Sequence, residues 1–90
     1  MLYMVVETFL NGDPAPVYRR MRESGRHMPE GLHYISSWVT DDLTRCYQVM
    51  ETDRRELLDE WIAHWSDIVG FEVFPVMTSA AARATVELEL

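Results

Sequence analysis

The sequence predicts a ferredoxin-like α+β domain, a four-stranded antiparallel sheet with two helices on one face. Segments rich in β-branched and aromatic residues alternate with two segments of helical apolar spacing, in the order strand, helix, strand, strand, helix, strand. That order is the split βαβ arrangement, and right-handed crossovers place both helices on the same side of the sheet. A length of 90 residues fits one domain spanning residues 1–90.

The first strand and helix are marked by composition and by clear stop signals. Residues 2–9 are rich in Val, Tyr, Phe and Met, as strands are. Asp13 is expected to cap the helix that follows, with Pro14 at its first position, where the missing N–H costs nothing. Gly25 is a suitable residue to end this helix.

Residues 32–40 and 44–52 are expected to pair as a hairpin across a tight polar connection. With a short loop, the numbers of paired residues sum to 83, so that Ile35 lies opposite Gln48. In this register Tyr34 points to the side away from Gln48. The spacing leaves open which side of the hairpin meets the helices.

The second helix is predicted over residues 54–67. Asp53 and Glu56 have the spacing of a capping box at its start. An apolar stripe along one face of this helix contains Leu57, Trp61, Trp65 and Ile68.

The C-terminal part is predicted to hold the fourth strand, residues 71–78. Pro75 cannot donate to a ladder and therefore indicates an edge strand or a bulge. Residues 79–84 favour a short helical turn. Residues 85–90 alternate in polarity, which predicts a short strand or a swapped arm.

Both faces of the first and fourth strands are largely apolar, which is unusual for a sheet with one face in water. A bare apolar face would be a large hydrophobic patch of the kind that monomers avoid. We therefore expect a second copy to cover it, and a two-fold homodimer is the simplest arrangement.

Charge and composition exclude several classes of function. The chain has 8 basic and 15 acidic residues, a net charge of −7, and every basic residue is an arginine. The lack of lysine excludes Schiff-base chemistry and a P-loop on this chain, and the negative charge argues against nucleic-acid binding. The arginines of residues 19–26 are expected on a solvated helix face, with an anion-recruiting patch as the alternative.

Other exclusions come from single residues and from hydropathy. Cys46 is the only cysteine, so neither an internal disulfide nor a multi-cysteine zinc site is expected. No apolar stretch reaches the roughly 18 residues of a membrane helix, and the N-terminal segment is a poor signal peptide. We expect a cytoplasmic protein without a membrane partner.

The chain resembles a family of short bacterial proteins of unknown function within the dimeric α+β barrel superfamily. The matching segments are LYMVVE (2–7), PEGL (29–32), YISSWV (34–39), RCYQVME (45–51), LLDEW (57–61), WSD (65–67), FEV (71–73) and PV (75–76). The resemblance implies the fold and a dimer but no established activity. Its wider superfamily includes cofactor-free monooxygenases, haem-degrading enzymes, isomerases and stress-response proteins, so the fold does not decide the function.

Polar side chains within otherwise apolar strands are the best indication of a site. A buried carboxylate needs a partner or a raised pKa, and Glu7, Gln48 and Glu51 are the candidate catalytic groups, with Glu72 also in such a position. Aromatic side chains are expected to wall a pocket for a small organic ligand. The candidate ligand-binding residues are Tyr34, Trp38, Tyr47, Gln48, Trp61 and Trp65.

Neither a metal nor a cofactor is expected. The histidines His27, His33 and His64 form no close ligand pair. The resemblance to haem-degrading proteins implies that a haem ligand would lie on or near the second helix, where His64 is the only candidate. Cys46, between apolar neighbours, is expected to be an inert buried thiol.

Two functions from different classes remain open. The first is ligand binding between sheet and helices, extending to cofactor-free oxygenation or isomerisation of a small aromatic or polyketide-like compound. The second is a non-catalytic stress-response or accessory protein whose sheet face is only an oligomer interface. A pocket that encloses at least two of the polar candidates favours the first, and a solid interior favours the second.

Overall fold

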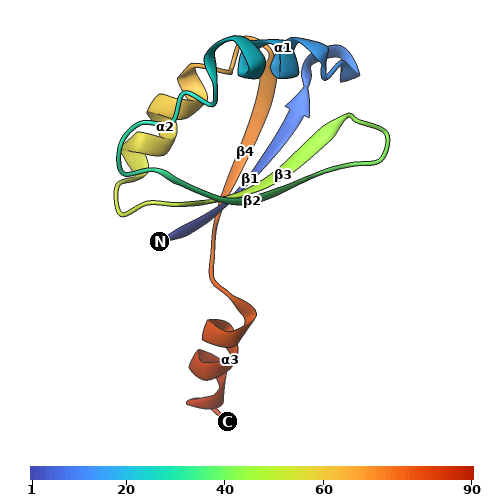
Figure 1. The fold of residues 1–90 in the computed structure, drawn as a ribbon. Coiled ribbons are helices and arrows are strands. Elements are labelled where there is room, and N and C mark those ends of the chain that lie inside the picture. The colour runs from blue at the N-terminus through green and yellow to red at the C-terminus, as the bar shows by residue number, and fades with distance from the viewer.

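The computed structural model describes residues 1–90 and has the predicted order of elements (Figure 1), which confirms the ferredoxin-like α+β fold. The elements are β1 (Leu2–Phe9), the 3-10 turn η1 (Leu10–Gly12), α1 (Ala15–Ser24), β2 (His33–Val39), β3 (Arg45–Glu51), α2 (Arg55–Ala63), β4 (Val69–Val76) and α3 (Ser79–Glu87).

The four strands form one antiparallel sheet in the order β2-β3-β1-β4. Both α1 and α2 cover the same face of it (Figure 1), as right-handed crossovers require. Because β4 is an edge strand, Pro75 removes no ladder bond from the centre of the sheet, which confirms the edge prediction. None of the helices combines the length and apolar composition needed to cross a membrane.

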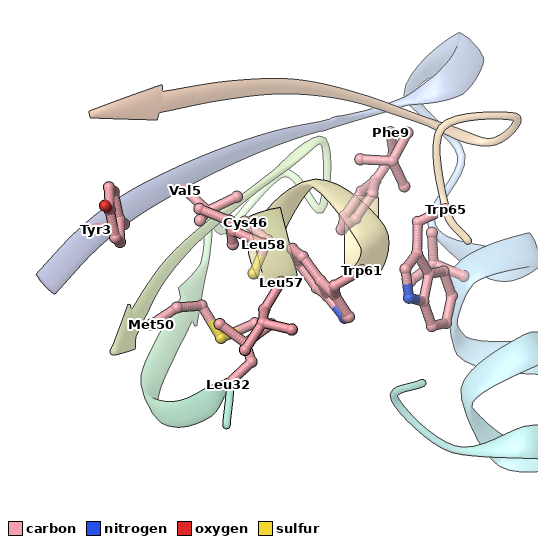
Figure 2. Close-up of a cluster of buried hydrophobic side chains, with 12 residues drawn as sticks. Tyr3, Val5, Phe9, Leu32, Cys46, Met50, Leu57, Leu58, Trp61 and Trp65 are labelled. Atoms are coloured by element: carbon pink, nitrogen blue, oxygen red, sulfur yellow. The ribbon is translucent and has the colours of Figure 1, made fainter. Parts of the chain in front are cut away.

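The core lies between the sheet and the two helices (Figure 2). The strand residues buried in it show which face of each strand meets the helices, a point that the spacing in the sequence leaves open. Tyr3, Val5 and Phe9 of β1 point toward α2, and the apolar side of α2 packs on them. The helix ends at Ala63 and not at residue 67 as predicted, so Trp65 of the predicted stripe joins the core from the turn that follows α2. The buried apolar residues are Tyr3, Val5, Phe9, Val17, Leu32, Cys46, Met50, Leu57, Leu58, Trp61, Trp65 and Val69. The opposite face carries no helix.

The helix starts differ from prediction in detail. The cap predicted for α1 is wrong by one residue: Pro14 is the N-cap and Ala15 the first helical residue, while Asp13, just before the cap, accepts a hydrogen bond from the Ala15 N–H (3.0 Å). The capping box predicted for α2 is wrong, since Glu56 binds the Arg54 guanidinium (2.9 Å) and the Thr52 hydroxyl accepts the Arg54 N–H (3.1 Å).

The predicted hairpin register is wrong. Ser37, not Ile35, lies opposite Gln48, because the connection occupies residues 41–44 and Leu43 adopts a positive φ of 62°. An irregularity between Tyr34 and Ser36 shifts the pairing again, so that Tyr34 lies opposite Met50. A bulge of this kind turns Tyr34 to the helix-covered side, where the simple alternation would not place it.

The chain beyond β4 forms the helix predicted for residues 79–84, which continues to Glu87, so the short strand, one of the two alternatives for residues 85–90, is wrong. The Thr78 hydroxyl accepts the Ala81 N–H (3.0 Å) and caps α3, and the alanines that follow favour a helix. In Figure 1 α3 extends away from the sheet and the other helices, and none of its residues is buried.

Candidate functional site

A half-open cavity of about 120 Å³ lies between the sheet and the helices, toward the end of the core where α1 and Trp65 meet. Its lining comes from β1, α1, the loop after α1, the hairpin and the α2 region. The lining residues are Glu7, Phe9, Val17, Tyr18, Met21, Arg26, Ser37, Val39, Cys46, Gln48, Trp61 and Trp65. Most of these are apolar, so the few polar groups define where a ligand's polar end would lie.

Gln48 is the most unusual of the polar groups. It is only 3% exposed, and its Nε2 has no hydrogen-bond partner. Its Oε1 accepts from Arg26 Nη1 (3.3 Å). Because a guanidinium can only donate, this contact fixes the orientation of the amide and leaves Nε2 as an unpaired donor that is itself buried.

Arg26 reaches the cavity because the loop that carries it is held on α2. Its carbonyl oxygen accepts from the indole N–H groups of both Trp61 (2.9 Å) and Trp65 (3.2 Å). Its guanidinium lies over the Tyr34 ring, 4.0 Å from the ring centroid, a cation–π contact that holds the charge in place. No carboxylate forms an ion pair with Arg26, whereas Arg20, Arg54, Arg55 and Arg83 each have one.

Glu7 lies beside Cys46 on the same sheet face and is 7% exposed. Burial raises the pKa of Glu7 from 4.5 to about 7, and the Cys46 hydrogen bond and the Arg26 charge oppose that rise. Burial, followed by the nearby Glu7 charge, raises the pKa of Cys46 to about 12. Near neutral pH, therefore, Glu7 exchanges a proton readily while Cys46 stays a thiol.

Comparison with known protein families identifies the family of this chain. The model of a family described as a domain of unknown function, DUF3303, matches residues 1–89. The chain belongs to the DUF3303 family. No curated protein and no solved structure matches it. The family description names no activity, so a function for this DUF3303 domain has to be argued from its geometry.

The structure brings together four of the predicted site residues in the DUF3303 domain. Glu7, Gln48, Trp61 and Trp65 line the cavity, and Tyr34 contacts it indirectly by stacking on Arg26. The two indoles do more than pack, since they also hold the loop that carries Arg26.

Three further candidates lie elsewhere. Trp38 and Tyr47 are paired on the helix-free face and are 59% and 36% exposed. Glu51, at the end of β3, binds the N-terminal ammonium group of Met1 (3.2 Å). None of these three lines the cavity. Glu72 is exposed, opposite Val6 on the helix-free face.

Arg26 is the site residue that sequence reasoning missed. It was expected on a solvated face with Arg19 and Arg22, and for Arg26 that expectation is wrong. Gly25 ends α1 with a φ of 74°, and His27 also has a positive φ of 58°, so the chain turns back toward the sheet between them. The glycine was the available signal, because an arginine just past a helix end need not share the helix's solvated face.

The histidines lie outside the cavity. His27 and His64 stack on each other with ring centroids 4.8 Å apart, near the edge of Trp65, and His33 is exposed. No group of three or more His, Cys, Asp and Glu side chains is placed to hold a metal ion.

Proposed function

We propose that this DUF3303 protein binds a small organic molecule in the cavity between the sheet and the helices. The unpaired Gln48 Nε2 is the observation that carries the proposal. An unsatisfied buried donor costs about 1–3 kcal/mol, and natural proteins retain few of them. A ligand oxygen that reached Nε2 would satisfy this donor, and Gln48 is one of the residues that line the cavity.

The cavity's size favours a ligand with one ring. Its volume of about 120 Å³ is close to that of engineered apolar cavities of about 150 Å³ that hold benzene. Phe9, Val39, Trp61 and Trp65 supply flat or branched apolar walls. We therefore propose a single aromatic or unsaturated ring with one polar substituent.

Glu7 is the group to which we assign proton transfer. A carboxyl that titrates near the working pH is effective both as a base and as an acid, and burial gives Glu7 that property. Cofactor-free oxygenation and isomerisation of a small aromatic or polyketide-like substrate would both begin with removal of a substrate proton. We propose Glu7 as the base for such a step, with Gln48 and Arg26 holding the anion formed.

The test is Gln48→Leu, which keeps the side chain's volume but removes the amide. Binding of one-ring probes (benzoate, benzamide and phenol), followed by Trp fluorescence, should be present in the natural protein and lost in the variant. The variant should be as stable as the natural protein or more stable, because an orphaned polar group has been removed. A large loss of stability with unchanged probe binding would mark Gln48 as structural.

We further propose that a second copy of the chain covers the helix-free face, as in a dimeric α+β barrel. The register places two apolar rows at its centre, and Phe74 is 48% exposed within them. These rows are Trp38–Tyr47–Val6 and Val49–Met4–Phe74. An exposed patch of this composition favours association.

Sedimentation equilibrium tests the dimer. The natural protein should have twice the chain mass, and Phe74→Arg, which puts a charge in the centre of the patch, should return it to a monomer without changing the cavity. A natural protein that is monomeric at micromolar concentration contradicts the dimer. A stable dimer that binds none of the probes favours the alternative of a non-catalytic protein whose sheet face is only an interface.

A further inference from the structure

We propose that the cavity's ligand is a single-ring carboxylate, bound as the anion while Glu7 takes up one proton. This inference rests on the proposed small-molecule binding and names the ligand class. It concerns the binding step alone, because a Glu7 that has taken up a proton must release it before it can act as a base. The observation behind it is the Arg26 guanidinium, which lines the cavity and forms no ion pair.

Arg26 is a half-buried guanidinium that lines the cavity without a carboxylate partner. The other unpaired arginines, Arg19, Arg22 and Arg45, are exposed, and water can solvate them. A partly desolvated cation without a counterion indicates a site for an anion. The tyrosine ring beneath Arg26 and the two indoles that bind its carbonyl oxygen hold the charge there before a ligand arrives.

The neighbouring donor specifies the shape of that anion. Gln48 Nε2 belongs to the same amide whose oxygen accepts from Arg26 Nη1, so the unpaired N–H and the guanidinium are joined through one side chain. A carboxylate has two oxygens on one carbon and can accept from two adjacent donors at once. A single carbonyl or hydroxyl oxygen would leave one of these donors unused.

Glu7 is the group that takes up the proton when the anion binds. An ionised Glu7 would repel a bound anion in the same small cavity, and a protonated Glu7 would not. Among the groups that face Glu7, the Arg26 charge favours the ionised form, and a bound carboxylate would compete with Glu7 for that charge. Cys46 of β3 is a neutral thiol, Arg26 is always charged, and Tyr18 of α1 is a phenol at the cavity wall. The nearest side chains from α2 and β4, Trp61 and Phe71, do not titrate.

Calorimetric titration with benzoate tests the inference. Measured between pH 6 and 8.5 in buffers of different ionisation heat, binding should take up about one proton above pH 7, and affinity should fall roughly tenfold per pH unit there. In Glu7→Gln, benzoate should still bind, without proton uptake and without that pH dependence. Benzamide, the neutral analogue, should bind more weakly than benzoate, and Arg26→Met should remove the difference between them.

The outcomes separate this inference from the proposed function. Benzamide binding as tightly as benzoate, or benzoate binding without proton uptake, overturns the inference and leaves small-molecule binding standing. Unchanged proton uptake in Glu7→Gln also overturns it, because another group would then hold the proton. Failure of every one-ring probe to bind the natural protein rejects both proposals.

Discussion

Glu7→Gln should change the pH dependence of stability in a defined direction. Burial raises the pKa of Glu7 from 4.5 to about 7, so in this range the folded chain holds a proton that the unfolded chain releases. Stability from this group is therefore complete below pH 4.5 and is lost as the pH rises through 7. Each pKa unit is worth about 1.4 kcal/mol, so the loss amounts to about 3 kcal/mol at pH 8 and above.

The assay is urea unfolding between pH 4 and 8.5, followed by the fluorescence of the buried Trp61 and Trp65. Glutamine keeps the shape of the protonated carboxyl and cannot ionise, so the variant should gain about 3 kcal/mol relative to the natural protein between pH 4.5 and 8. Glu72→Gln makes the same change on the exposed, helix-free face and controls for the loss of one carboxylate. Parallel pH profiles for Glu7→Gln and the natural protein would refute the reasoning.

Two further predictions concern the loop before β2 and the thiol. Gly31→Ala should cost about 1–3 kcal/mol of unfolding free energy, because its φ is +94° and a Cβ would lie 2.9 Å from Leu57 Cδ1. Gly70→Ala, where the nearest atom would be 3.8 Å away, should be close to neutral, and equal losses at both sites would contradict this account. With its pKa raised to about 12, Cys46 should react with a thiol reagent at pH 8 about a thousandfold more slowly in the folded than in the unfolded protein. Equal rates would mean that Cys46 is not shielded.

The parts of the fold that follow local patterns were predictable. The bounds predicted for β1, residues 2–9, agree with the structure, because a run of strand-forming residues ends at a turn. Leu57, Leu58 and Trp61 are buried on the side of α2 that faces the sheet, as helical spacing predicts, and Trp65 is buried as predicted although it lies in the turn after the helix. Glu7 and Gln48 were identifiable because polar groups are costly among apolar strand residues.

The rest depends on contacts that no local pattern encodes. The hairpin register follows from the left-handed conformation of Leu43, a residue that gives no sign of it in the sequence. No feature of the sequence indicates the bulge between Tyr34 and Ser36, which turns Tyr34 toward Arg26. Arg26 lines the cavity with its carbonyl oxygen bound by two indoles that lie far along the chain. The cation of the site is thus a product of tertiary structure.

The most direct test of the ligand site is the side-chain amide signal of Gln48. Gln48 and Asn11 are the only side-chain amides in the chain, and Asn11 is exposed in the turn after β1. In ¹⁵N-resolved NMR spectra recorded during a benzoate titration, the Gln48 NH₂ signals should shift and saturate, while those of Asn11 stay in place. Gln48 signals that do not move, or that move only together with those of Asn11, would contradict a site built on this amide.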